Sequence, residues 1–234
     1  MKSNISILFS AFLLLATQAS GQREMAQFQQ ILRDFQKLTV LNMDIEAIGY
    51  ETKSSKGATI MKGSMKLNGN KFYSKSDDME MLVVGEDMIA VDHEAKEVSI
   101  ARSKPIAELK AEQVAFQLDS LIAKGGKVSF LGNKAGLRLY SVKTPKSMIT
   151  ELQIGVNEDN LIAQVTYFFQ SLPDLESTYH KVEVKFTNMN KVPAPDSFFD
   201  SKKFFANRKA KKLAPHLKNY EVNEADYSTA DLGF

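Results

Sequence analysis

The stretch TIMKGSMKLNGNKFY, residues 59–73, contains two strand patterns separated by a turn signal. In its first half Met61, Met65 and Leu67 share one face with a glycine, and lysines and a serine lie between them. Asn68-Gly69 follows, a pair that favours a tight hairpin turn because both residues tolerate positive φ. The chain then continues as a strand at 71–73. This stretch predicts a β-hairpin with one apolar face.

The same period-two pattern extends outward along the chain. Short apolar or alternating runs joined by turn-forming residues predict further strands at 79–84, 88–91, 98–100, 127–131, 137–144, 149–156, 161–169 and 181–186. Short connections make sequential strands neighbours in an antiparallel sheet. We therefore expect an up-and-down sheet with one apolar and one charged face.

Two helices are expected to cover the apolar face. Apolar residues at spacings of three and four, from Phe28 to Leu38, predict a helix over residues 23–38. Pro105, with Ser103 as a candidate cap, opens a second helix over 107–124. The predicted fold is mainly β with helices (α+β): a strongly curved antiparallel sheet, or incomplete β-barrel, covered by two or more helices.

The N-terminus has the pattern of a secretory signal peptide. Lys2 precedes an apolar run at 5–16, and Ala19-Ser20-Gly21 resembles a cleavage site. We expect residues 1–21 to be removed before Gln22, which would leave an exported, soluble protein. The chain has no cysteine, which excludes disulfides and an acylated N-terminal cysteine. The periplasm is the expected compartment.

The remaining residues suit one domain, which we place at 22–208, followed by a C-terminal extension at 209–234. A formal charge of +2 for the whole chain argues against nucleic acid as the partner. Residues 201–218 nevertheless contain seven Lys or Arg and no acid. This basic run predicts either a solvated tail or contact with anionic lipid or an acidic partner.

Asp92-His93-Glu94 is the strongest candidate for a catalytic or metal-binding cluster. The three residues fall between two predicted strands, where a polar turn is expected, and further ligands at suitable spacing are absent from the sequence. We favour a solvated turn. Because common catalytic motifs and tryptophan are also absent, we expect a protein that is not an enzyme and has no cofactor or bound metal.

Methionine points to a binding surface instead. Six of the nine methionines beyond the leader fall in the early strands, and methionine suits surfaces that fit ligands of variable shape, although it also fills ordinary cores. We predict that a hydrophobic cavity is lined by Met61, Met65, Leu67, Phe72, Met81, Val83, Ile154, Val165, Tyr167, Val184 and Phe186. Their strand neighbours, expected to face water, are Lys62, Lys66, Glu80, Glu151, Gln164, Glu183 and Lys185.

Three segments, 63–73, 82–92 and 152–167, resemble the outer-membrane lipoprotein carrier proteins, the LolA/LolB-like group. The resemblance implies a half-barrel with a helical lid whose cavity holds lipid or lipoprotein acyl chains. It also implies a monomer that makes transient contacts with membrane-bound donor and acceptor proteins. The arginine that latches the family's lid is not evident in Lys66-Leu67-Asn68-Gly69. Two functions stay open: a lipid carrier, or an envelope sensor module that recognises another hydrophobic ligand or a protein partner.

Overall fold

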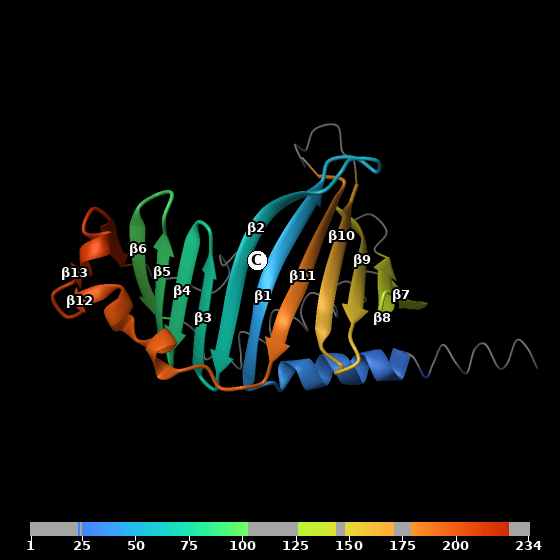
Figure 1. Cartoon of the computed structure of the whole chain (residues 1–234), viewed down its shortest axis with the longest axis horizontal. Helices are drawn as coiled ribbons and strands as arrows, with labels where there is room; N and C mark the ends of the chain where they lie inside the picture. The colour runs from blue at the N-terminus through green and yellow to red at the C-terminus, as the bar shows by residue number, and fades with distance from the viewer. Residues whose placement is uncertain (1–22, 24, 103–125, 144–147, 171–178, 225–234) are drawn as a thin grey trace, which may run out of the picture.

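The computed structural model describes residues 23, 25–102, 126–143, 148–170 and 179–224. Its main feature is a sheet of 12 strands in the order β14-β6-β5-β4-β3-β2-β1-β11-β10-β9-β8-β7 (Figure 1). The strands are β1 (Val40–Tyr50), β2 (Ala58–Asn68), β3 (Lys71–Ser76), β4 (Met79–Val84), β5 (Asp87–Asp92), β6 (Glu97–Arg102), β7 (Lys127–Lys134), β8 (Leu137–Lys143), β9 (Ile149–Val156), β10 (Ile162–Phe169), β11 (Lys181–Asn190) and β14 (Glu221–Glu224).

The sheet consists of two meanders joined by one seam. β1 to β6 are sequential neighbours, β7 to β11 are sequential neighbours, and β1 pairs antiparallel with β11 between them. β14 adds a parallel strand beside β6. Because β7 and β14 lie at opposite ends of the order, the sheet is not closed, and Figure 1 shows that it is curved, as the sequence predicted.

The hairpin of residues 59–73 forms with a small shift in its turn. Leu67 pairs with Phe72, and Asn68 still pairs with Lys71, so the two turn residues are Gly69 and Asn70. Gly69 has φ of +62°, a conformation that glycine adopts without steric cost. The expected turn was therefore one residue too early.

β1 was missed in the sequence, although its pattern is clear in retrospect. Leu41, Met43, Ile45 and Ala47 alternate with polar side chains at the positions between them. β1 lies at the centre of the sheet, between β2 and β11.

One of the two predicted helices is present, at residues 25–36. Phe28, Ile31 and Leu32 are buried against β8 and β9, and the ring of Phe28 stacks on Tyr140 with centroids 4.3 Å apart. We call the side of the sheet that this helix covers the inner face. The second predicted helix, 107–124, and the predicted signal peptide, 1–21, lie outside the described residues.

Residues 194–224 are also built into the fold. We call residues 194–224 the C-terminal segment; it lies over β3 to β6 on the opposite, outer face (Figure 1). Between β11 and β14 it contains η2 (Asp196–Phe199), η3 (Ser201–Lys203), β12 (Phe205–Asn207), β13 (Lys212–Leu213) and η4 (Pro215–Leu217). Phe199, Phe204, Phe205 and Leu217 pack there on Leu82 and its neighbours.

This second layer corrects one expectation. The outer face of β3 to β6 is not a charged, solvated surface, because buried side chains on it include Tyr73, Leu82, Ile89, Val91 and Val98. The sheet therefore has a core on both faces at this end.

Candidate functional site

Strand register places the predicted cavity residues on the inner face in continuous rows. One row runs through paired residues on five strands, in the order Met61, Ala47, Val184, Val165 and Ile154. A second row runs through Leu41, Leu67, Phe72, Val83 and Met88. Because side chains alternate between faces, Met65, Met81, Tyr167 and Phe186 fall on the same face.

These residues differ in how far they are covered. Leu67, Met81, Val83 and Ile154 are buried, whereas Met61 is 37% exposed. The half-buried members of the set are Met65, Phe72, Val165, Tyr167, Val184 and Phe186. The inner face thus has packed ends and a partly accessible middle, near the β1–β11 seam.

Two buried clusters form these packed ends. One contains Phe28, Tyr140 and Ile154, and the other contains Leu41, Leu67 and Met81. Phe35 and Phe186 pack against both clusters, so the apolar surface is continuous across the seam. Burial also raises the pKa of Tyr167 in the first cluster, as expected for a phenol in apolar surroundings.

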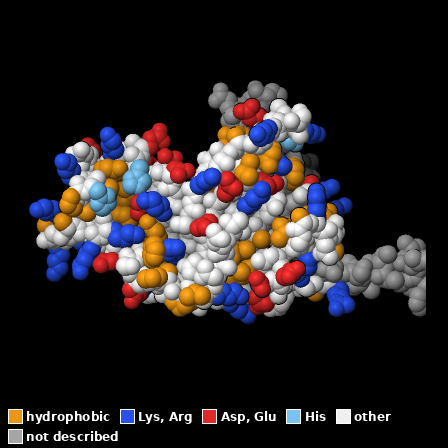
Figure 2. Space-filling model, viewed as in Figure 1, with side chains coloured by type: hydrophobic (Ala, Val, Ile, Leu, Met, Phe, Trp, Pro, Cys, Tyr) orange, Lys and Arg blue, Asp and Glu red, His pale blue; other side chains and the backbone are white. Residues whose placement is uncertain are grey.

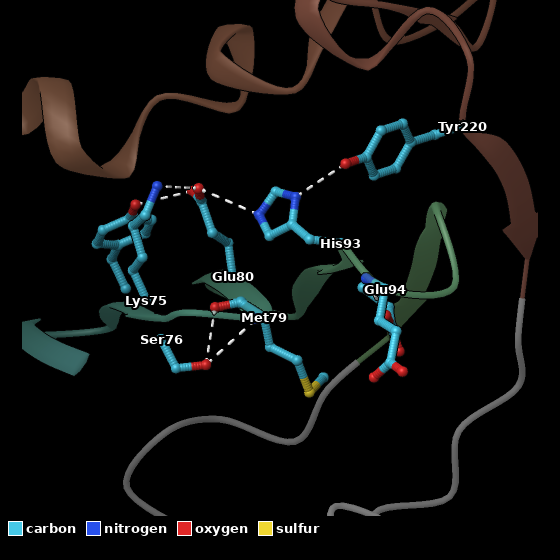
Figure 3. Close-up of polar contacts among 9 residues, drawn as sticks. Lys75, Ser76, Met79, Glu80, His93, Glu94 and Tyr220 are labelled. Atoms are coloured by element: carbon cyan, nitrogen blue, oxygen red, sulfur yellow. Dashed lines mark hydrogen bonds and ion pairs between the residues drawn. The ribbon is translucent and has the colours of Figure 1, made fainter. Parts of the chain in front are cut away.

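Among the residues expected to face water, Glu80 is an exception. It lies on the outer face but is buried beneath the C-terminal segment. Its carboxylate accepts hydrogen bonds from Tyr73 Oη at 2.8 Å and from Lys75 Nζ at 2.6 Å (Figure 3). Burial opposes ionisation of Glu80, yet these two donors outweigh it and the pKa of Glu80 lies below its ordinary value.

His93 extends this outer polar cluster, which comprises Tyr73, Lys75, Glu80, His93 and Tyr220. Its Nε2 lies 3.5 Å from Glu80 Oε1, and its Nδ1 lies 3.0 Å from Tyr220 Oη (Figure 3). Residues 93–96 do form a turn, as predicted, but His93 is half-buried in it. The expectation of a solvated side chain was wrong because it took no account of the C-terminal segment, which supplies Tyr220.

A pocket of about 470 Å³ also lies on the outer face, between β3 to β5 and the C-terminal segment. Leu82, Ile89 and Phe199 form part of its wall. Its two cations are both paired with carboxylates, Lys71 with Asp196 at 2.7 Å and Arg208 with Asp87 at 3.0 Å. This mixed lining, which also includes Asp200, is less suited to an acyl chain than the inner face.

Within the described residues, no group of three or more His, Cys, Asp or Glu side chains is placed to hold a metal ion. In the same part of the chain, no helix is long and apolar enough to cross a membrane.

Sequence reasoning missed the C-terminal side of the outer polar cluster. Tyr220 follows no strand or helix period that would have linked it to His93, in the turn after β5. One signal was available: 79–84 is almost continuously apolar, a pattern typical of strands covered on both faces.

Neither family profiles nor curated proteins match this sequence. Solved structures do align with it. An uncharacterized conserved protein from Thermus thermophilus has 4% identity and a TM-score of 0.47, over 86% of this chain and 99% of its own. A LolA superfamily protein from Nitrosomonas europaea has 12% identity and a TM-score of 0.31, over 74% and 96%.

A third alignment is with MucB, in its complex with MucA, from Pseudomonas aeruginosa. The identity is 10% and the TM-score 0.39, over 75% of this chain and 60% of that chain. None of these three alignments reaches a TM-score of 0.5, so they carry no information on ligand or partner.

Proposed function

We propose that this protein is a non-enzymatic carrier that binds acyl chains of lipids or lipoproteins on its inner face, in the periplasm. The observation that carries the proposal is the continuous apolar row from Met61 to Ile154 across five paired strands. At a strand spacing of about 4.8 Å such a row spans roughly 19 Å. That length suits an extended fatty acyl chain.

The incomplete burial of this row supports a ligand-binding surface rather than a closed core. Ile154 and the small Ala47 are buried, but Val165 and Val184 are half-buried, and Met61 at one end of the row is 37% exposed. An apolar ligand that covers these partly accessible side chains binds favourably, by about 25 cal/mol per Å² of apolar surface buried. Methionine at the open end accommodates chains of different shape.

Two adjacent residues of β2 allow a matched test. Met61 belongs to the inner-face row, whereas Ile60 is 42% exposed and falls at the irregularity in the β1–β2 register. Met61→Glu and Ile60→Glu introduce the same carboxylate at neighbouring, accessible positions. Each variant should fold, because an accessible carboxylate stays hydrated.

The measurement is binding of a fluorescent fatty acid to the wild type and to both variants. Met61→Glu should weaken binding by about tenfold or more, a loss of at least ~1.4 kcal/mol, and Ile60→Glu should leave it nearly unchanged. Equal binding by all three proteins, or none by the wild type, would refute the carrier. Native mass spectrometry of protein purified from its own periplasm would identify the bound lipid. A stable protein partner with an empty inner face would favour the sensor module instead.

A further inference from the structure

Two lysines approach the ring of Phe198 on the outer face, and a third is close enough to one of them for its charge to act on it. Lys66 comes from β2, Lys75 from β3 and Lys203 from η3. Lys66 Nζ lies 4.6 Å from the centroid of the Phe198 ring, and Lys203 Nζ lies 5.4 Å from it. Lys203 Nζ also lies 3.8 Å from the ring centroid of Tyr73. We call Lys66, Lys75 and Lys203 the lysine group.

The lysine group has more positive charge than its surroundings neutralise. Glu80 accepts a hydrogen bond from Lys75, whereas Lys66 and Lys203 have no ion-pair partner among the described residues. Three ammonium groups and one carboxylate leave an excess of two positive charges, without counting His93 beside Glu80. Other cations of the outer face, such as Lys71 and Arg208, are individually paired.

The excess positive charge contributes to a lowered pKa of Lys203. Burial is the main cause that lowers its pKa, and the nearby charges of Lys75 and Lys66 lower it further, against the opposing effect of Glu80. The side chain is nevertheless held over two aromatic rings, where a cation is attracted to the ring faces. A bound anion would relieve the repulsion that the fold leaves uncompensated.

We propose that the lysine group binds the phosphate of a phosphate monoester. Such a group carries about −1.5 to −2 charges at pH 7, which matches the local excess of two positive charges. Lysine ammonium groups bind phosphate as mobile point charges and need no fixed bidentate geometry. Neighbouring basic side chains beside the histidines are visible on the surface over β3 and β4 (Figure 2).

Binding here would link two parts of the chain. Lys66 and Lys75 belong to the sheet, whereas Lys203 and Phe198 belong to the C-terminal segment. A phosphate held by both would fasten the segment to the outer face and stabilise the folded state by mass action. This site is independent of the inner face, so failure of either proposal leaves the other standing.

The first test measures thermal unfolding with inorganic phosphate against chloride at equal ionic strength. Phosphate should raise the Tm of the wild type, and calorimetric titration should show the same binding. Lys203→Gln and Lys66→Gln should each raise the Kd by about tenfold, whereas Lys203→Arg should retain binding. Lys202→Gln is the matched control, because Lys202 is adjacent and exposed.

The second test distinguishes free phosphate from a lipid headgroup, with vesicles of neutral lipid containing either phosphatidic acid or phosphatidylglycerol. Preference for phosphatidic acid, lost in Lys203→Gln, identifies a lipid phosphate monoester as a ligand. Binding of inorganic phosphate without vesicle binding identifies a soluble one. The proposal is overturned if phosphate has no effect beyond chloride and the two vesicles bind equally. It is also overturned if Lys202→Gln loses as much binding as Lys203→Gln.

Discussion

The hydroxyl of Tyr220 lies 3.0 Å from Nδ1 of His93, and this contact joins the turn after β5 to the C-terminal segment. The two rings also meet edge to face, with centroids 5.9 Å apart. In the sequence, Asp92-His93-Glu94 resembled a reactive cluster. In the structure, His93 is part of the interface between the sheet and the C-terminal segment.

This interface predicts the effect of replacing His93. His93→Ala removes the partner of Tyr220 and one neighbour of Glu80, and should lower the free energy of unfolding by about 1 kcal/mol, the typical contribution of a hydrogen bond. Chemical denaturation would measure it. Glu94→Ala, at the exposed neighbouring position, should stay within about 0.5 kcal/mol. Equal effects of the two substitutions would restore the interpretation of a solvated turn.

Glu80 predicts a dependence of stability on pH. Its pKa in the folded state lies below the ordinary value of 4.5, so its contribution is present above that value and is lost as the pH falls through the folded pKa. Glu80→Gln should therefore be less stable than the wild type at pH 7, by about 1–3 kcal/mol. The difference should shrink below about pH 4.5. A difference that stays constant from pH 7 to about pH 3 would contradict this account.

Met65→Glu tests whether the inner face is accessible to ligand or is a closed core. Met65 is half-buried and pairs with Met43, which is buried. If ligand and water reach this position, the carboxylate is hydrated, the fold survives and binding of a fatty-acid probe falls. In a closed core the unpaired charge would cost several kcal/mol and unfold the protein. Thermal melting and probe binding should be measured together; a stable variant with normal binding would place the ligand elsewhere.

Phe28→Ala tests the docking of the N-terminal helix. Phe28 is 1% exposed and stacked on Tyr140, so its truncation leaves a cavity and should cost about 3–5 kcal/mol. Gln29→Ala, on the exposed side of the same helix, should change stability by about 0.5 kcal/mol or less. A cost below about 1 kcal/mol for Phe28→Ala would show that the helix contributes little to the core.

Local pattern was enough to predict most of the strands and the first helix. Alternation in β2, β9 and β10 fixed which side chains share the inner face, because a slip of one residue would invert the whole set. The hairpin connections made neighbours of sequential strands. The seam between β1 and β11 was not predicted, because it joins residues far apart in sequence and no turn specifies it.

The position of the C-terminal segment on the outer face was still less predictable from the sequence. Phe198, Phe199, Phe204 and Phe205 form an aromatic run without helix or strand periodicity, so the sequence could not show which surface they cover. Lys203 was recognised only as one of several basic residues in an expected tail. Its contacts with the rings of Tyr73 and Phe198 depend on how the C-terminal segment folds back onto the sheet.

The seam between β1 and β11 also determines when the sheet can finish forming during synthesis. Ile45 pairs with Phe186, so one edge of β1 stays without its partner until the chain has been synthesised as far as β11. At about 5–20 residues per second this interval is on the order of ten seconds. During that time β1 and β2 would present an open strand edge with an apolar side, a feature that favours pairing with other chains. A nascent chain of this protein is therefore expected to need protection from self-association until β11 arrives.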